Sequence, residues 1–462
     1  MDKSLRIMLK SLILISLIIV NYLVSILKSE DIKLLTTLFI TFYIIVITYF
    51  IINNGKRALA DYRFIFINVF FLYSIVSPIY YILDDFKTIP MNFIVSEQTI
   101  FEVVKKYFFT FNIFCIYAIV FSKYKMKKEN KKNISKYFNE YNLTQDNLFI
   151  IYDFIAILCL LIFLRPVLVD GINIFTVDKR YYASMISSNL TNYSYYYFQA
   201  YSIYIICNLL NLFSYKLFNK RNIMRYLLVL IYWGLNLKVG IRFEFIVVFL
   251  ACIVYAFSIN LNIKKRHIMY IGLSVIGLLF IGVIREFRNS SNLSQKNFLQ
   301  ILYPMTAEFI LPQYISYFYY NFPKQLILGK SYIIYSFLYL FPSFIIPNKP
   351  ITMGIEFMND SRKKGAGLAF NPIAESILNF GERSDIWLPL ILISISIIVY
   401  LLKDKEPLIY ILVVASSVAF CRGQFAIWIT DIIFIYTILK FISLTKKRRN
   451  KIEVFNNTSN IK

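Results

Sequence analysis

This chain has little histidine and lacks closely spaced cysteine pairs. His267 is the only histidine among 462 residues, and it follows the basic run 264–266, so we expect its side chain to be solvated. None of the five cysteines has the paired spacing of a zinc site or a disulfide framework. They lie in or at the edge of apolar segments, where we expect them to pack in a core or face lipid: Cys115, Cys159, Cys207, Cys252 and Cys421.

Motifs for nucleotide and metal chemistry are also missing. The chain has no Walker-type phosphate loop, no dinucleotide glycine motif and no HExxH sequence. It has no Asp-x-Asp pair that could hold a metal-bound nucleotide sugar. A nucleotide-using or metal-dependent enzyme is therefore disfavoured, and we predict no cofactor and no metal ion.

What the chain does contain is apolar sequence. Hydrophobic residues make up 58% of it and aromatic residues 18%, and its mean hydropathy is +0.60. Such values are typical of repeated membrane spans. The first apolar run, 12–27, continues without the small-residue cleavage site of a signal peptide, so we expect it to be retained as a span. The sequence predicts an all-α, polytopic membrane protein.

Apolar runs of about 17–25 residues are long enough to cross a bilayer as helices. They predict about twelve spans, at 9–27, 34–52, 64–83, 104–122, 148–168, 198–215, 226–239, 244–259, 268–284, 386–402, 407–421 and 425–442. Two further segments, 298–322 and 332–346, are apolar enough to be interfacial or re-entrant helices. If both crossed the membrane, the count would be fourteen.

The net charge of +24 follows the predicted topology better than it indicates nucleic-acid binding. Basic residues favour the cytoplasmic side of a membrane, and the following groups fall on one side of the predicted spans: Lys3, Arg6, Lys10, 56–57, 123–136, 216–225, 264–266, 403–405 and 446–449. We therefore predict a multi-pass membrane protein with both termini in the cytoplasm.

This topology divides the chain into four parts. Residues 1–284 hold spans one to nine, with an external loop near 165–197; residues 285–385 form a large external loop; residues 386–445 hold the last three spans; and 446–462 is a basic cytoplasmic tail. The large loop is too long for an ordinary connection and too apolar for disorder. We expect it to fold as a cap of short helices, with its polar chemistry concentrated in 326–381.

Arginines at the predicted outer mouth are unusual because positive residues are disfavoured on that face. Arg242 lies between two spans with almost no loop, Arg285 and Arg288 end the ninth span, and Arg422 lies in the tight turn between the last two. The planar guanidinium group suits phosphate oxygens. These arginines predict a pyrophosphate or phospholipid headgroup site. The alternative is that each reaches for lipid headgroups or pairs with a nearby acid.

Several acidic residues are also candidates for function. Glu375, in an apolar helical context after Pro372, is a candidate general base; the alternative is a pairing with a lysine or arginine of the cap. Glu356 and Asp360 are expected to pair with the basic triplet Arg362, Lys363 and Lys364. Asp153 and Asp431 lie inside predicted spans and are functional candidates by default. For Asp431 the alternative is a pairing with Arg422, and Asp153 is close enough to a span end to be hydrated.

Taken together, a series of short motifs resembles the Wzy-type oligosaccharide repeat-unit polymerases of O-antigen and capsule assembly. In chain order these are Gly240-Ile241-Arg242, Gly329-Lys330-Ser331-Tyr332, Phe341-Pro342, Pro347-Asn348-Lys349-Pro350, Gly365 to Gly367, Ala374-Glu375, Asn379-Phe380-Gly381 and Arg422-Gly423. They cover roughly 235–442. Each motif alone is weak, and their joint order is more specific.

The resemblance implies a multi-pass glycosyltransferase of the bacterial plasma (inner) membrane that works at the outer face of that membrane. It would move a growing glycan from undecaprenyl diphosphate to the non-reducing end of a lipid-linked repeat unit, for lipopolysaccharide or capsule. Its partners would be these lipid-linked oligosaccharides and membrane lipid, together with a chain-length regulator and a flippase, and no nucleic acid.

The resemblance also implies roles for individual residues. Glu375, Arg242 and Arg422 would be catalytic, with Glu375 activating the acceptor hydroxyl. The tyrosines within 193–197 would contact sugars, and the remaining substrate-binding residues would be Arg180, Arg285, Arg288, Lys349, Arg362, Lys363, Lys364 and Asn379.

Three other functions compete with the polymerase. An O-antigen ligase shares the architecture but is thought to use an outer-face histidine, whereas His267 is predicted to be cytoplasmic. A lipid-linked oligosaccharide flippase would carry its charges in a central cavity within its spans, where this chain has few. A non-catalytic partner in polysaccharide export is the third alternative.

Overall fold

The computed structural model describes residues 3–87, 95–121, 147–174, 189–212, 220–239, 243–258, 298–341, 345–361 and 370–459, together with Tyr182 and Met185. Every regular element in these ranges is a helix. Helices satisfy their own backbone hydrogen bonds, which apolar surroundings require. The all-α prediction is therefore confirmed for this part of the chain.

The chain divides into two compact units. Unit 1 comprises Met1–Lys125, Asn262–Tyr400 and Ser417–Trp428, and unit 2 comprises Met126–Leu261, Leu401–Ser416 and Ile429–Lys462. The elements of unit 1 are α1 (Lys3–Ile26), η1 (Ser29–Asp31), α2 (Ile32–Asn54), η2 (Gly55–Ala60), α3 (Tyr62–Asp84), α4 (Glu97–Val120), α12 (Phe298–Asn321), α13 (Lys330–Tyr339), α14 (Met353–Asp360), α15 (Pro372–Phe380), η4 (Gly381–Arg383), most of α16 (Ser384–Lys405) and α18 (Ser417–Cys421).

Local sequence explains where several of these helices begin. Asp61 caps α3 by accepting a hydrogen bond from the backbone N–H of Arg63 and also pairs with the Arg63 guanidinium at 2.6 Å. Ser96 caps α4 in the same way through the N–H of Thr99. Asn371 caps α15, and Pro372 occupies the first turn, where its missing N–H costs nothing. Side-chain caps therefore fix the entry into each of these helices.

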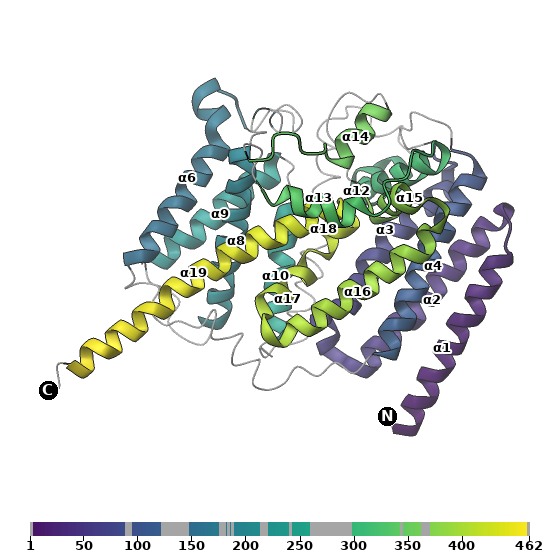
Figure 1. Cartoon of the computed structure of the whole chain (residues 1–462), viewed down its shortest axis with the longest axis horizontal. Helices are drawn as coiled ribbons and strands as arrows, with labels where there is room; N and C mark the ends of the chain where they lie inside the picture. Colours follow the sequence, from purple (N-terminus) through teal and green to yellow (C-terminus); the bar gives the residue numbers. More distant parts are fainter. Residues whose placement is uncertain are drawn as a thin grey trace. The chain divides into compact units, whose positions relative to one another are not determined.

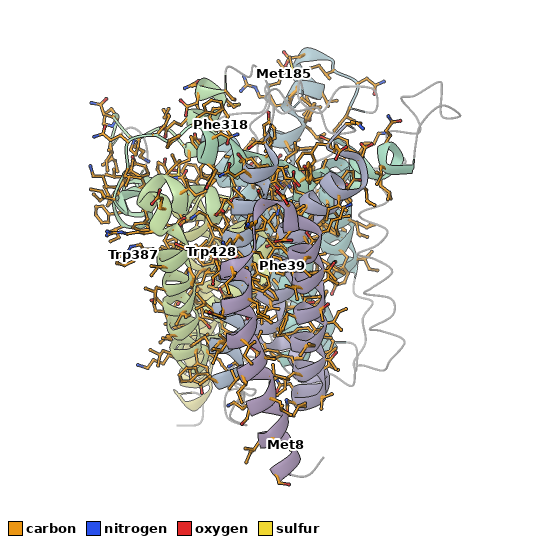
Figure 2. The ribbon with its side chains drawn as sticks, turned by 90° about the vertical axis from the view of Figure 1, so that its right-hand side faces the viewer. Met8, Phe39, Met185, Phe318, Trp387 and Trp428 are labelled. Atoms are coloured by element: carbon orange, nitrogen blue, oxygen red, sulfur yellow. The ribbon has the colours of Figure 1, made fainter. Side chains whose placement is uncertain are left out.

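The core of unit 1 forms where α12 packs against α3, α4 and α15. Polar bonds tie these helices together inside an aromatic core. Gln313 on α12 accepts a hydrogen bond from the backbone N–H of Ser77 on α3 at 3.1 Å, and the Tyr317 hydroxyl lies 2.9 Å from the Ser77 hydroxyl. Figure 2 shows Phe39 inside the bundle of long helices, with Met8 near the far end of α1. This packing fixes α15, and with it Glu375, relative to α12.

Unit 2 contains α6 (Asn147–Asp170), α8 (Asn189–Leu212), α9 (Lys220–Val239), α10 (Phe243–Ser258), α17 (Pro407–Ala415) and most of α19 (Phe425–Ser459). Helix α8 packs against α6, α9 and α10, and α10 also packs against α17. The centre of this unit is aromatic: the Phe198 ring stacks on Tyr232 with centroids 3.6 Å apart. Such pairs add to the stability gained from burial.

Seven described segments are long and apolar enough to cross a membrane: Ile7–Ile26, Ser29–Asn54, Tyr62–Asp84, Glu97–Val120, Ile150–Asp170, Pro372–Lys403 and Phe425–Ser443. Each overlaps a predicted span. The other five predicted spans have no counterpart among these segments, so the count of twelve is not confirmed. Helices α8 and α9 are not among the seven, and α10 has only 16 residues. The predicted span 407–421 is divided at Ser416 into α17 and α18, and 268–284 lies outside the described residues.

The predicted external loop also has described structure. The segment 298–322 forms one helix, α12, which is buried along much of its length. After it come three short helices, α13, α14 and α15, which gather in Figure 1 near the end of unit 1 where α16 begins. Their role as an external cap stays a prediction.

Candidate functional site

Glu375 on α15 is the most buried acidic side chain among the candidates, with 1% of its surface exposed. Its Oε1 accepts a hydrogen bond from the hydroxyl of Ser331 on α13 at 2.6 Å. Its Oε2 accepts one from the backbone N–H of Phe425, the first residue of α19, at 2.8 Å. One carboxylate therefore connects three elements that are far apart in the sequence.

The partners of Glu375 explain how a carboxylate is held at this depth. Both donors are neutral, and each one satisfies a different oxygen of the carboxyl group. Phe425 also lies at a helix N-terminus, where free N–H groups and the helix dipole favour negative charge. The alternative that paired Glu375 with a lysine or arginine of the cap is not what these bonds show: its described partners are a serine hydroxyl and a backbone amide.

Asn379 extends the cluster by one helical turn along α15. Its Nδ2 donates to the Ser331 hydroxyl at 2.8 Å and to the backbone carbonyl of Glu375 at 2.7 Å. Its Oδ1 is buried without a hydrogen-bond partner in the described part of the chain. Ser331 is itself fully buried, so it bridges the two side chains of α15.

Arg422 lies in the turn that joins α18 to α19, three residues before Phe425. Its guanidinium group pairs with Glu308 of α12 at 2.7 Å, and the two side chains are 25% and 33% exposed. The same turn is held from the other side, because Gln424 accepts a hydrogen bond from the backbone N–H of Met353 on α14 at 3.0 Å. Arg422 is thus fixed in position while remaining accessible.

The glycine after Arg422 is required by the tightness of this turn. A Cβ built on Gly423 would lie 2.7 Å from the backbone carbonyl oxygen of Ala419, a distance that real Cβ atoms do not adopt. Gly381, which separates α15 from η4, has a φ of +60° that side-chain-bearing residues rarely adopt. Both glycines shape the backbone on either side of Glu375.

The structure brings together part of the predicted site. Glu375 and Asn379 are in contact through Ser331, and the Arg422 turn joins them through Phe425. Seven predicted residues lie outside the described residues: Arg180, Arg242, Arg285, Arg288, Arg362, Lys363 and Lys364. Their proximity to Arg422 stays a prediction.

The sequence analysis did not single out Glu308 as a candidate. The signal was available, because Glu308 is the only charged residue in the 24-residue helix α12, and an ionisable side chain in an apolar helix indicates a specific partner. The Phe425 amide left no signal at all, since a backbone N–H is present at nearly every position. Its role depends on where α19 begins.

Two other basic residues have described partners. Lys349 donates a hydrogen bond to the backbone carbonyl of Phe341, and burial lowers its pKa. Lys324 pairs with Glu356 at 3.0 Å and with Asp360 at 2.5 Å. Burial lowers the pKa of Lys324, but its hydrogen bonds to the two carboxylates outweigh that effect and leave its pKa raised. The acids expected to pair with the triplet therefore pair with Lys324, and the triplet lies outside the described residues.

The acidic residues of unit 2 have aromatic and basic partners. Asp153 accepts hydrogen bonds from Arg225 at 2.8–3.0 Å and from the Tyr201 hydroxyl at 2.8 Å. Asp431 accepts one from the Tyr196 hydroxyl at 2.7 Å, and the Tyr196 ring stacks on Phe434. The pairings found are thus Arg422 with Glu308 and Asp431 with Tyr196.

Metal ligands are not grouped in the described residues: no three His, Cys, Asp or Glu side chains there could hold a metal ion. The five cysteines are free and buried, as the sequence predicts.

Comparison with known proteins gives one match. A protein-family model described as O-antigen polysaccharide polymerase Wzy matches residues 7–451, which is nearly the whole chain. No curated protein and no solved structure matches it.

Proposed function

Because the chain belongs to the O-antigen polysaccharide polymerase Wzy family, we propose that it extends a glycan that is carried on a membrane lipid. The donor is a growing glycan on undecaprenyl diphosphate, and the acceptor is the non-reducing end of a lipid-linked repeat unit. The family match and the seven apolar helices support a multi-pass bacterial membrane protein of polysaccharide biosynthesis. The outer face of the plasma membrane, with both termini inside, is part of the proposal.

The reaction is a substitution at the donor's reducing-end sugar. The acceptor hydroxyl oxygen forms a bond to the anomeric carbon, the bond from that carbon to the diphosphate breaks, and the diphosphate leaves with the electron pair. The hydroxyl proton passes to a base. Negative charge grows on the leaving diphosphate, so a fixed cation beside it would lower the barrier.

Among the described residues, Arg422 is best suited to stabilise the leaving diphosphate. Its position and partial exposure are the observation on which the proposed site rests. It is permanently charged, has a planar fork of donors for phosphate oxygens, and is a quarter exposed in a turn fixed by Gly423 and Gln424. Glu308 pairs with the guanidinium group at 2.7 Å. A diphosphate would compete with or join this carboxylate.

Glu375 supports the proposed site by holding neighbouring elements in place. Its bonds to Ser331 and Phe425 fix the start of α19 and therefore the Arg422 turn. The general-base role stays a prediction, and it requires that one of these two bonds be exchanged for a bond from the acceptor hydroxyl. Arg242, Arg285 and Arg288 are proposed to share the diphosphate with Arg422. The other predicted binding residues, including Lys349 and Asn379, are proposed to contact the glycan.

Extension of a defined lipid-linked repeat unit by purified protein in liposomes, without nucleotide, tests the reaction. We expect the wild-type protein to form a ladder of products and Arg422→Ala to form none, because the charge on the leaving group is no longer balanced. Arg422→Lys, which keeps the charge without the fork, is the matched control and should retain part of the activity. Wild-type product lengths from Arg422→Ala would remove this residue from the site.

Deletion of the gene separates the polymerase from the alternatives. A cell that lacks the polymerase should display surface glycan of one repeat unit. Complete loss of surface glycan would favour a ligase or a flippase instead.

A further inference from the structure

Helix α13 presents its polar side to the protein and its apolar side outward. Ser331 is fully buried against Glu375, and the hydroxyl of Tyr339 donates to the backbone carbonyl of Pro350. On the opposite side, Ile333 is 76% exposed, Ile334 47% and Phe337 61%. We call these three residues the apolar face of α13. In a protein surrounded by water the apolar side would pack inward.

The spacing of these residues shows that the apolar face is continuous. Residues 333, 334 and 337 follow the three- and four-residue spacing that places side chains on one side of a helix. Leu328, in the turn just before the helix, is 73% exposed. The exposed Lys330 lies three, four and seven residues before them, so this side of the helix carries one basic residue at its start. Exposed apolar surface rimmed by polar residues marks an interaction site.

The length of α13 decides how it could meet a membrane. Its ten residues extend about 15 Å at about 1.5 Å each, which is half of a typical hydrocarbon thickness of about 30 Å. A helix this short cannot cross the hydrocarbon region, so its exposed apolar side chains can reach lipid only from the edge of the bilayer.

Aromatic packing relates α13 to the start of α16. The Tyr332 ring stacks on Phe380 with centroids 6.0 Å apart, and Phe380 stacks on Trp387 at 5.3 Å. Trp387 lies in the first turn of α16, is 46% exposed, and is seen near that end of the helix in Figure 2. Tryptophan is enriched where membrane spans meet the lipid headgroups. α13 is therefore connected by two ring contacts to a half-exposed tryptophan at the start of α16.

We propose that α13 is an interfacial helix whose apolar face docks into the lipid bilayer, and that this docking holds Ser331 against Glu375. The occupant is lipid because the face is mainly apolar, is connected through ring contacts to Trp387 at the start of α16, and belongs to a protein with seven candidate spans among its described residues. The second part rests on the proposed function, since it links lipid contact to the Arg422 turn through Ser331, Glu375 and Phe425. The polymerase would then be fully assembled only in a membrane that supports α13.

Spin labels on single introduced cysteines test the docking. The five native cysteines are buried, so Ile333→Cys and Phe337→Cys should be labelled selectively in liposomes. We expect both labels to collide several-fold more often with oxygen, which concentrates in lipid, than with a water-soluble nickel chelate. Gln325→Cys, in the exposed connection between α12 and α13, is the matched control and should show the reverse.

Two outcomes would overturn the docking. High chelate collision at 333 and 337 would place the face in water, and exclusion of both reagents would mean that protein covers it. Neither collision measurement needs enzyme activity, so it tests the docking alone. Failure of the proposed reaction would be seen separately, as a wild-type protein that does not extend the glycan.

Ile333→Asp tests the link to the site, with Ile333→Leu as its control. At equal amounts in the membrane, we expect Ile333→Asp to shorten the product ladder several-fold and Ile333→Leu to leave it unchanged. An unchanged ladder from Ile333→Asp, while the wild-type protein extends glycan normally, would overturn the link.

Discussion

Glu375 in unit 1 and Asp153 in unit 2 are both acidic side chains in mainly apolar helices, but their partners differ. Asp153 is 25% exposed and faces the Arg225 guanidinium, which is 4% exposed. Glu375 is 1% exposed and faces a serine hydroxyl and a backbone amide. The charge on Asp153 is balanced by one opposite charge, whereas the described partners of Glu375 are dipoles from two other elements.

The difference bears on what each carboxylate does. An ion pair needs only two side chains and is satisfied wherever they meet. The arrangement around Glu375 exists only when α13, α15 and the start of α19 are all in place. Glu375 therefore reports on the assembly of the proposed site, while Asp153 stabilises the packing of α6 against α9.

The largest expected effect comes from Glu375→Ala. It leaves the Phe425 N–H and the Ser331 hydroxyl without their acceptor, and each unsatisfied buried donor costs about 1–3 kcal/mol. We expect the free energy of unfolding to fall by about 2–5 kcal/mol, measured by thermal unfolding of purified protein in detergent. Glu375→Gln should lose less, since its carbonyl oxygen still accepts one bond. Equal melting temperatures for wild type and Glu375→Ala would show that these bonds contribute little.

Asp153→Ala should have the next largest effect. Breaking a fully buried pair costs about 3–5 kcal/mol because a charge remains unpaired, and partial exposure of Asp153 reduces this to about 1–3 kcal/mol. A second change, Arg225→Met, removes the guanidinium charge that has lost its bonds to Asp153, so the double variant should regain part of the loss. Simple addition of the two single effects would contradict the ion-pair description. No second side-chain substitution can rescue Glu375→Ala in this way, because one partner is backbone.

Ser331→Ala should have the smallest effect of the three. It removes one hydrogen bond to Glu375 and the acceptor of the Asn379 amide, which keeps its bond to the Glu375 carbonyl. We expect a loss of about 1–2 kcal/mol in the same unfolding measurement. Ser336→Ala is the matched control on α13, since that hydroxyl bonds only within its own helix. The comparison fails if the two alanine variants are equally stable.

Seven of the predicted spans could be identified from sequence because length and hydropathy are local properties. The structure of the tyrosine-rich α8 and of the divided segment 407–421 was harder to predict from these local properties. The break at Ser416 is marked in the sequence only by the pair Ser416-Ser417, and the residues beyond this pair are apolar and helical. Spacing along the chain predicts a continuous helix there.

The candidate site shows the same limit. Glu375, Asn379 and Arg422 were found because polar residues are rare in this chain and these lie in unusual contexts. Their partners were not, since Glu308 is 114 residues from Arg422 in the numbering and Ser331 is 44 residues from Glu375. Sequence predicted Asp431 as an alternative partner for Arg422 because the two residues are only nine positions apart in the chain.

The amino-acid sequence by itself determined that this protein is helical, apolar and built to lie in a membrane, because these properties follow from composition and period. Only the tertiary structure decided which groups meet the Glu375 carboxylate and which acid holds Arg422. A buried charge is satisfied by whatever donors folding brings within about 3 Å, and those include a backbone amide that no side-chain pattern identifies.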